Sequence, residues 1–342
     1  MPIEDLKPPK EGEWVDFADD RRRLLLFGGP ITDPLGTLGE QGWEEFELLS
    51  TPRALSDAGG LGEAAGRTHL VASGGVPEAS GAIVDDVGSE RLVALGGGRV
   101  IDSAKAVAAV SGGEVAAIPT TLSGAPMTAI HRLPEDRGAA TGVRPSLVIA
   151  YTDEMTSAPE PQLRATAMNA LAHGADSLYT PLADETSRGA GLRGAELIAG
   201  ALDQSPGRRN RAALALGALL SGIAVDRAGI ALHHVLGQTT VRVLGTPHAE
   251  TYAALLPHTM EAMRSRAPEQ IEALAAALGT DGEALRERIA DLGGDRHLSE
   301  LGAERARLDE VLDVAMRRGE LEHMTPGEVT REDLAAILAA AW

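Results

Sequence analysis

Three stretches of the sequence place histidines where they could act together on a ligand. Asn169 and His173 lie four residues apart in a segment of helical pattern, so their side chains share one helix face. His233 and His234 are adjacent, and because neighbouring helical residues diverge by about 100°, only one of them can face a given site. His248 follows a proline, which is typical of the first turn of a helix.

Such a set of side chains is suited to two kinds of chemistry. Neutral imidazoles bind zinc or ferrous iron, so the three histidines and the carboxamide could form a metal site. The same groups could equally bind and protonate an acid substrate. A third interpretation is that each is an ordinary buried or surface histidine. Spacing alone leaves these alternatives open.

A further stretch, separate from the histidines, has the pattern of a ligand-binding turn. An apolar run, 91–95, is followed by Gly96, Gly97 and Gly98, a helical pattern and another apolar run, 115–118. This order predicts a βαβ unit. Glycines let backbone N–H groups approach a ligand, and a helix N-terminus favours an anion. The stretch is not the dinucleotide fingerprint G-x-G-x-x-G with its downstream acid, so a turn without a ligand is the alternative.

Polar side chains follow in this helix and in the loop after the next strand. Asp102 is a candidate cofactor contact. Alternatively, its negative charge only stabilises the first turn of the predicted helix. For Lys105 we expect a solvated side chain rather than a catalytic one. The loop is rich in hydroxyls that suit phosphate or nicotinamide contacts, although loops carry hydroxyls for other reasons too. Its hydroxyl residues are Thr120, Thr121, Ser123 and Thr128.

Composition narrows the classes of function. The chain of 342 residues is 44% hydrophobic, enough for two domains or one large one. A net charge of -19 argues against nucleic acid or an anionic membrane as partner, but not against an anionic small substrate. The absence of cysteine excludes disulfides and thiolate chemistry. No signal peptide or membrane-length apolar run is evident, so we expect a cytoplasmic protein.

The pattern of elements changes near residue 152. We expect a loose charged arm over residues 1–20, then a parallel α/β sheet. Its predicted strands are 23–27, 46–49, 69–72, 92–95, 115–118 and 146–150. Helical periodicity then predicts an all-α region, with Thr330 and Asp333 capping the last helix. Its candidate helices are 160–179, 186–203, 208–236, 248–264, 268–278, 282–292, 306–318 and 331–341.

Several segments resemble the motifs of iron-containing alcohol dehydrogenases. GGGRVIDSAK is similar to their G-G-G-S-x-x-D-x-A-K segment, and IPTTLSGAPMT to their P-T-T-x-S-G-S-E-x-T loop. MNALAHGADSLYTPLAD resembles D-A-x-x-H-A-x-E-x-x-x-S, while LHHVLGQ and GTPHAETYAALLPH resemble the two later histidine segments. The match covers roughly residues 92–263, about half of the chain. It implies the dehydroquinate synthase-like architecture, a Rossmann-like α/β domain followed by an all-α domain, and a homodimer.

Within this superfamily the chain most resembles maleylacetate reductases, which share the asparagine at 169, the H-H-x-L pair and P-H-A-E-T. The resemblance implies NAD(P)H-dependent reduction of maleylacetate to 3-oxoadipate in aromatic-ring degradation. The family's metal positions correspond to Asn169, His173, His234 and His248, which in this branch act on substrate without a metal. Asparagine in place of a carboxylate also removes a negative charge from any cation site and weakens divalent binding.

Departures from the family pattern keep other functions open. Arg99 replaces a serine, the segment Ser123-Gly124-Ala125-Pro126 lacks the Ser-Glu pair, and Gln238 stands where the family has a third helical histidine. The alternatives are a metal-dependent alcohol dehydrogenase or aldehyde reductase, and an altered homologue that only binds a ligand. A phosphate-substrate relative is disfavoured because the helical region contains no lysine.

We therefore expect a dinucleotide-binding domain, 1–155, and a helical substrate domain, 156–342, with an oxidoreductase site in the cleft between them. Hydride would pass from NADH or NADPH to a carbonyl or conjugated alkene of a small, possibly carboxylated substrate. Bound iron or zinc is the less favoured alternative. The cofactor residues are expected to be Gly96, Gly97, Gly98, Asp102, Thr120, Thr121, Ser123 and Thr128. The catalytic residues are expected to be His173, His234 and His248, and the substrate-binding residues Asn169, Gln238 and Arg242.

Overall fold

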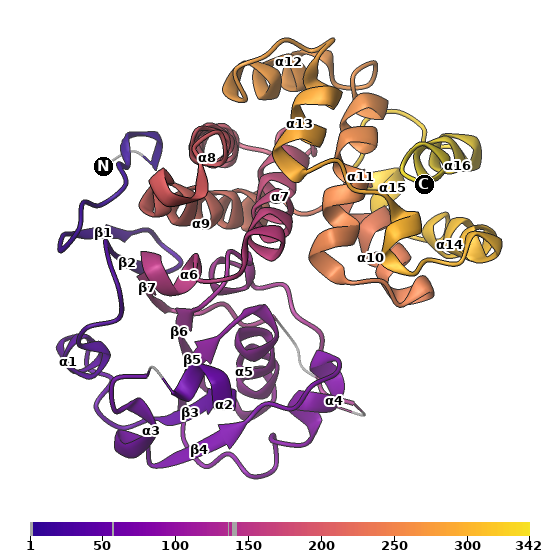
Figure 1. Ribbon diagram of the computed structural model, residues 1–342. Helices are drawn as coiled ribbons and strands as arrows, with labels where there is room; N and C mark the ends of the chain where they lie inside the picture. The colour runs from indigo at the N-terminus through magenta and orange to yellow at the C-terminus, as the bar shows by residue number, and fades with distance from the viewer. Residues whose placement is uncertain (1–2, 57, 136, 139–141) are drawn as a thin grey trace. The chain divides into compact units, whose positions relative to one another are not determined.

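The computed structural model describes residues 3–56, 58–135, 137–138 and 142–342 of the chain. Contacts divide it into two compact units, Asp5–Ala158 and Pro159–Trp342. Figure 1 shows a sheet with flanking helices in the first unit and helices throughout the second. Each unit is described by itself.

The first unit is built on a seven-stranded sheet of order β1-β2-β7-β6-β5-β3-β4. β1 is antiparallel to β2, and the other neighbouring strands are parallel. The strands are β1 (Trp14–Ala18), β2 (Arg23–Phe27), β3 (Glu47–Ser50), β4 (Arg67–Leu70), β5 (Arg91–Gly96), β6 (Glu114–Pro119) and β7 (Leu147–Tyr151). The six predicted strands are confirmed, each within two residues.

Helices cover both faces of this sheet, which explains the continuous apolar runs of its central strands. On one face, Leu92 and Ala94 pack with residues of α4 and α5. On the other, Val93 and Leu95 pack with residues of α1 and α3. The helices of this unit are α1 (Pro34–Glu40), α2 (Pro52–Leu55), α3 (Leu61–Ala64), α4 (Val76–Gly81), α5 (Gly98–Ser111) and α6 (Thr152–Met155).

The prediction of a loose arm over residues 1–20 is wrong, because this segment contains strand β1. β1 is an edge strand whose residues alternate between exposed and half-buried positions, so its apolar signal is weak. The Trp14 ring lies 4.8 Å from the Phe27 ring on β2, measured between centroids, and fixes the pairing from one face.

The second unit consists of helices, as predicted. They are α7 (Glu160–Asp176), α8 (Glu185–Leu202), α9 (Arg211–Ala228), α10 (Leu232–Leu244), α11 (His248–Met263), α12 (Pro268–Ala277), α13 (Leu285–Gly293), α14 (Leu308–Ala315), α15 (Gly319–His323) and α16 (Arg331–Ala340). Thr330 and Asp333 form the expected capping box of α16.

The predicted helix over 208–236 is wrong, since the chain breaks there into α9 and α10, which meet at 101°. Gly229 ends α9 with a φ of +76° and donates its N–H to the Val225 carbonyl. A side chain at Gly229 would also lie 2.9 Å from the Met324 methyl group. The break starts a new helix just before His233 and His234.

Close approaches between helices set the position of α7. A Cβ added at Gly174 on α7 would lie 3.0 Å from the Gly191 carbonyl oxygen on α8. One added at Gly194 on α8 would lie 2.8 Å from the Gly217 carbonyl oxygen on α9. Glycines therefore allow α7, α8 and α9 to pack backbone against backbone, next to His173.

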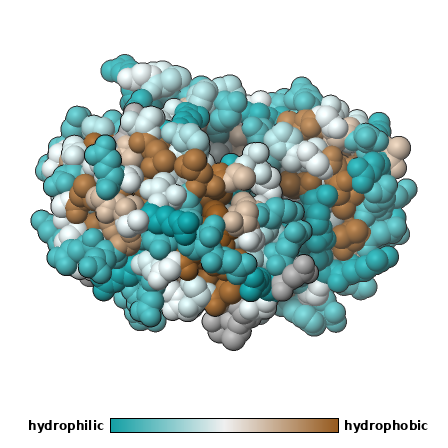
Figure 2. All heavy atoms as spheres, turned by 90° about the horizontal axis from the view of Figure 1, so that it is seen from below, coloured by the Kyte–Doolittle hydropathy of each residue, from teal (hydrophilic) through white to brown (hydrophobic). Residues whose placement is uncertain are grey.

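Apolar surface in the described part of the chain is scattered. Figure 2 shows hydrophilic residues over much of the face it presents, with hydrophobic residues between them. The large exposed apolar side chains are Trp14, Leu70, Ile130, Leu182 and Met316. Of the described helices, none is by itself long and apolar enough to cross a membrane, although the bent pair α9 and α10 together passes that test.

His233 is a core residue of the second unit. It is fully buried, and its Nδ1 lies 2.8 Å from the Thr259 hydroxyl on α11. Burial, together with the neighbouring His234, lowers the pKa of His233 to about 3. The ring is therefore neutral at pH 7.

Lys105 is also a core residue, so the expectation of a solvated side chain is wrong. It has no exposed surface, and its Nζ donates to the carbonyls of Ala125 and Ile130 at 3.0 and 2.8 Å. It also bonds the Thr128 carbonyl at 3.0 Å and pairs with Asp102 at 2.7 Å. The lysine thus ties the loop after β6 to helix α5.

We expect Lys105→Met to destabilise the protein by about 3 to 5 kcal/mol, because it leaves Asp102 and several buried carbonyls without their cation. Lys10→Met, at an exposed lysine, should change stability by no more than about 0.5 kcal/mol. Denaturant unfolding of both variants measures this. Equal stabilities would show that the buried ammonium does not anchor the loop.

Stability should fall as the pH drops below the pKa of an unfolded histidine, about 6.5. Between that value and about 3, the unfolded chain binds a proton at residue 233 that the folded chain excludes. At pH 5 this costs the folded state about 2 kcal/mol. The variant His233→Gln should lose that part of the difference in unfolding free energy between pH 7 and pH 5.

The exposed histidine at position 323 provides the control for this titration. His323→Gln should leave the difference between pH 7 and pH 5 unchanged. An unchanged difference in His233→Gln would mean that residue 233 titrates normally in the folded protein.

Candidate functional site

The glycine turn of the first unit brings the hydroxyl loop against the start of helix α5. Gly97 precedes the helix, and no side chain caps its N-terminus. A Cβ at Gly97 would lie 3.1 Å from the Thr121 methyl carbon, and one at Gly98 would lie 3.0 Å from the Ser123 hydroxyl. Side chains at these two positions would therefore push the loop away from the helix.

This arrangement fits the phosphates of a dinucleotide. The helix N-terminus offers N–H donors and a positive dipole end to an anion. The buried Ser123 hydroxyl has no hydrogen-bond partner among the described residues, so it is available to a ligand. Thr120 lies at the same turn and donates its N–H to the Gly96 carbonyl at 3.0 Å.

Two of the expected cofactor residues lie around Lys105 and not at the glycine turn. Asp102 pairs with Lys105, and the Thr128 hydroxyl lies 3.4 Å from the same ammonium. The structure thus groups Gly96, Gly97 and Gly98 with Thr120, Thr121 and Ser123, and groups Asp102 and Thr128 around Lys105.

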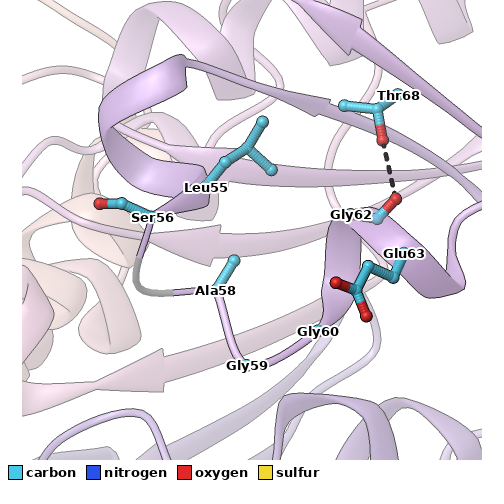
Figure 3. Close-up of a pocket in the computed structure, with 8 residues that line it drawn as sticks. All are labelled: Leu55, Ser56, Ala58, Gly59, Gly60, Gly62, Glu63 and Thr68. Carbon is cyan, nitrogen blue, oxygen red and sulfur yellow. Dashed lines mark hydrogen bonds between the residues drawn. The ribbon is translucent and has the colours of Figure 1, made fainter.

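A separate pocket of about 470 Å³ lies beside α2 and α3 in the first unit (Figure 3). Thr68 donates to the Gly62 carbonyl across it at 3.4 Å. Of the residues that line it, Glu63 is the charged one. A lone carboxylate does not suit a phosphate, so we assign this pocket no part in cofactor binding.

In the second unit the three predicted catalytic histidines and Tyr252 form one cluster of contacting rings. The His173 and His234 rings are stacked, with centroids 4.7 Å apart, although they come from α7 and α10. Tyr252 on α11 stacks on His248 at 4.4 Å and meets His234 edge-on at 5.2 Å. Gly237 makes room for the tyrosine, because a Cβ there would lie 2.9 Å from its ring.

A buried carboxylate that the sequence analysis did not single out orients His234. Asp176, fully buried at the end of α7, accepts a hydrogen bond from Nδ1 of His234 at 2.8 Å. The same oxygen accepts the backbone N–H groups of Ala231 and His234 at 3.0 and 3.1 Å. Tyr179 also donates its hydroxyl to this carboxylate. Asp176 therefore both caps α10 and assigns the proton of the His234 ring to Nδ1.

The Asp176 carboxylate stays ionised in this environment. Burial by itself raises its pKa, but the hydrogen bonds from His234 and Tyr179 and the electrostatic attraction to His234 together outweigh burial and lower the pKa below its usual value. A buried negative charge next to the ring stabilises any positive charge that His234 gains.

The other two histidines of the cluster are neutral at pH 7. Burial, followed by the nearness of other imidazoles that would repel a positive charge, lowers the pKa of His173 well below its usual value. Burial and His234 also lower the pKa of His248, to about 4. His248 is nevertheless exposed to solvent, and water screens this effect. His248 is thus the member of the cluster that a ligand in solution reaches most easily.

The three expected substrate-binding residues differ in burial and in hydrogen-bond partners. Asn169 is buried on α7, and its Oδ1 has no partner among the described residues. Gln238 lies one turn after His234 on α10, and its Oε1 accepts from Nη2 of Arg318 at 3.1 Å. Arg242 is exposed, two turns beyond His234.

The implied metal ligands are not arranged around one point in the described part of the chain, although Nδ1 of His173, Nε2 of His234 and Oδ1 of Asn169 are buried without a partner there. The described residues contain no group of three or more His, Asp or Glu side chains placed to hold an ion. The His173 and His234 rings are stacked with only 19° between their planes. Imidazole lone pairs lie in the ring plane, so two nearly parallel stacked rings cannot both meet one ion at about 2.1 Å. Asp176, the nearby carboxylate, is engaged by His234.

Two of the site residues could have been found from their spacing. Tyr252 lies four residues after His248 and Asp176 three after His173, so each shares a helix face with a predicted catalytic residue. Arg318 gives no such signal, because it reaches Gln238 across 80 residues of sequence.

Comparisons with known proteins identify the family of the chain. Residues 164–342 match the model of the Fe-containing alcohol dehydrogenase family, C-terminal. Maleylacetate reductase 2 of Cupriavidus pinatubonensis is 32% identical, over 93% of this chain and 94% of that protein. Maleylacetate reductase of a Rhizobium species is 30% identical, over 97% and 93%.

Solved structures show the same fold over nearly the whole chain. The crystal structure of maleylacetate reductase from Agrobacterium tumefaciens matches with a TM-score of 0.81 and 25% identity, covering 96% of this chain and 98% of that one. An iron-containing alcohol dehydrogenase from Thermococcus thioreducens matches with a TM-score of 0.79 at 20% identity. The family model and these relatives together show that the chain belongs to the Fe-containing alcohol dehydrogenase family and is an oxidoreductase.

Proposed function

We propose that this protein is an NAD(P)H-dependent reductase of the maleylacetate type. The observation that carries the proposal is the histidine cluster around Tyr252, with His234 held by a buried carboxylate. The similarity to maleylacetate reductases along nearly all of the chain supports it. The substrate would be a small carboxylated molecule with a carbonyl or a conjugated alkene.

The cofactor is assigned to the first unit. Gly97, Gly98 and the N–H groups at the start of α5 would hold its phosphates, with Thr121 and Ser123 alongside. When bound, the reduced nicotinamide supplies a hydride to the substrate carbon. NADH and NADPH both satisfy these contacts.

Substrate binding is assigned to the second unit. Hydride addition to a carbonyl or a conjugated alkene leaves negative charge on a substrate oxygen, which needs hydrogen-bond donors and a proton. His234 can do this work as an imidazolium: Asp176 holds its Nδ1–H, and Nε2–H, which has no partner among the described residues, can pass its proton to the substrate oxygen and leave a neutral ring. His248 and the neutral Tyr252 hydroxyl are candidate donors beside it, with Asn169 and His173 completing the site.

We propose that the reaction needs no metal. The stacking of His173 on His234 and the carboxamide of Asn169 support this reading. The alternative, a metal-dependent alcohol dehydrogenase or aldehyde reductase, is supported by the family name and by the free Nε2 of His234 and Oδ1 of Asn169. The homodimer, the cytoplasmic location and the domain roles of 1–155 and 156–342 remain predictions.

The test is turnover of maleylacetate, followed by the absorbance of NADH or NADPH, before and after dialysis against EDTA. We expect oxidation of one of the two cofactors, unchanged by the chelator. Activity that disappears with EDTA and returns with Fe²⁺ or Zn²⁺ would establish the metal-dependent alternative. No turnover of any carbonyl substrate with either cofactor would leave only a ligand-binding homologue.

Two histidines on helix α11 give a matched pair for the same assay. His248→Ala should lower kcat by about 100-fold or more, since it removes a proton donor or oxyanion contact. His258→Ala, ten residues further along the helix, should stay within about twofold of the wild type. Equal losses of kcat in the two variants would mean that activity depends on the integrity of the helix and not on the histidine cluster.

Asp176→Asn should lower kcat by about 10- to 100-fold, because the carboxamide no longer holds His234 in one tautomer or balances its charge. The dissociation constant of NADH, measured by calorimetry, should not change. Asp184→Asn is the control, since Asp184 also caps a helix, α8, but contacts no histidine of the cluster. Both variants should lose stability, and only Asp176→Asn should lose kcat.

A further inference from the structure

We infer that Arg318 binds a carboxylate of the substrate, and that it does so at a cavity lined by residues between Met316 and Val329. This inference rests on the proposed function. Arg318 immediately precedes α15 and is mostly buried, with 21% of its side chain exposed. It lies far in sequence from the motifs that pointed to the site.

Contacts connect Arg318 to the histidine cluster. Its Nη2 donates to Oε1 of Gln238 at 3.1 Å. Gln238 follows His234 by four residues on α10, so the two side chains share one helix face. The guanidinium is therefore bound to a side chain that lies one helical turn from the proposed proton donor. That spacing suits a substrate with its reacting carbon at one end and a carboxylate at the other.

The charge of Arg318 acts on the cluster as well. Burial and Asp176 raise the pKa of Tyr252, and the positive charge of Arg318 opposes them. His173 and His248 are neutral at pH 7, so they cannot balance an anion. With a net charge of -19, the protein needs a local cation to hold an anionic substrate. Arg318 supplies one at the required place.

A cavity of about 630 Å³ adjoins this side chain. Arg317, Arg318 and Gly319 line it, and so does Thr325, whose buried hydroxyl has no partner among the described residues. The volume lies in the ordinary range for small-ligand sites, about 300 to 1,000 Å³. It is thus large enough for one end of a small dicarboxylate.

Glu320 occupies two donors of Arg318 in the absence of substrate. Nη2 and Nε of the arginine lie 2.6 and 3.1 Å from the two carboxylate oxygens of Glu320. Nη1 has no hydrogen bond to a described residue and can meet a second carboxylate. Glu322 and Glu328 also line the cavity, so the guanidinium must hold the substrate by direct contact rather than by a general positive field.

This assignment differs from the one suggested by sequence, which named Arg242. That residue follows His234 by eight positions, about 12 Å along the helix, and is exposed. An exposed guanidinium is screened by water and contributes little to binding. Arg318 contacts Gln238, one helical turn from His234, and its side chain is better shielded from water than that of Arg242.

Steady-state kinetics of Arg318→Met and Arg242→Met separate the two arginines. We expect Arg318→Met to raise KM for maleylacetate by about 10- to 100-fold, the loss of one charge-assisted contact, and Arg242→Met to stay within about twofold. For a carbonyl substrate of similar size without carboxylates, Arg318→Met should leave KM and kcat unchanged. Glu320→Gln should lower KM for maleylacetate, because it frees the guanidinium.

A purely structural role predicts another result: Arg318→Met would then lower activity equally for both substrates and lower the melting temperature. That outcome, or a larger KM effect in Arg242→Met, would overturn the inference. Arg318→Lys keeps the charge but loses the planar fork, so an intermediate KM is expected.

Calorimetric binding of adipate, a six-carbon dicarboxylate, tests Arg318 without any turnover. Wild-type protein should bind adipate, and Arg318→Met should bind it at least tenfold more weakly. If this difference is seen in a protein that does not reduce maleylacetate, the proposed function fails and the carboxylate site stands. If both proteins bind adipate equally, the inference about Arg318 is wrong even where turnover is present.

Discussion

The hydrogen bond between Asp176 and His234 is the constraint on which the rest of the site depends. A carboxylate without exposed surface is costly unless it is fully hydrogen-bonded. Here one oxygen accepts the imidazole and two backbone N–H groups, so the start of helix α10 and the ring orientation are set by the same group. His173 and Tyr252 then pack on a ring that is already fixed.

The helical unit is built to make this contact possible. The turn at Gly229 ends α9 and lets α10 begin where its N–H groups face Asp176. Glycine contacts draw α7 against α8, which places the carboxylate and His173. In the first unit, the absence of side chains at Gly97 and Gly98 likewise lets the hydroxyl loop reach the uncapped end of α5. Each unit thus uses missing side chains to bring polar groups together.

Local patterns in the sequence predicted the sheet, most helices and the histidines, because these follow from hydrophobic period and helical spacing. They failed where long-range contacts decide. Lys105 is buried because carbonyls from a distant loop surround it, and Arg318 reaches the site through a partner 80 residues away. The break at Gly229 was hidden within a continuous alanine- and leucine-rich run, and β1 within a polar one. Asp176 and Tyr252 had helical spacing from known candidates but no distinctive residue type.

The account is tested most directly by the protonation of the His234 ring, measured by ¹⁵N NMR of the histidine-labelled protein at neutral pH. We predict that Nδ1 carries a proton in the resting protein and that this proton is shielded from exchange by its hydrogen bond to Asp176. An Nδ1 without a proton, with the neutral ring protonated only at Nε2, would contradict the proposed orientation of the proton donor.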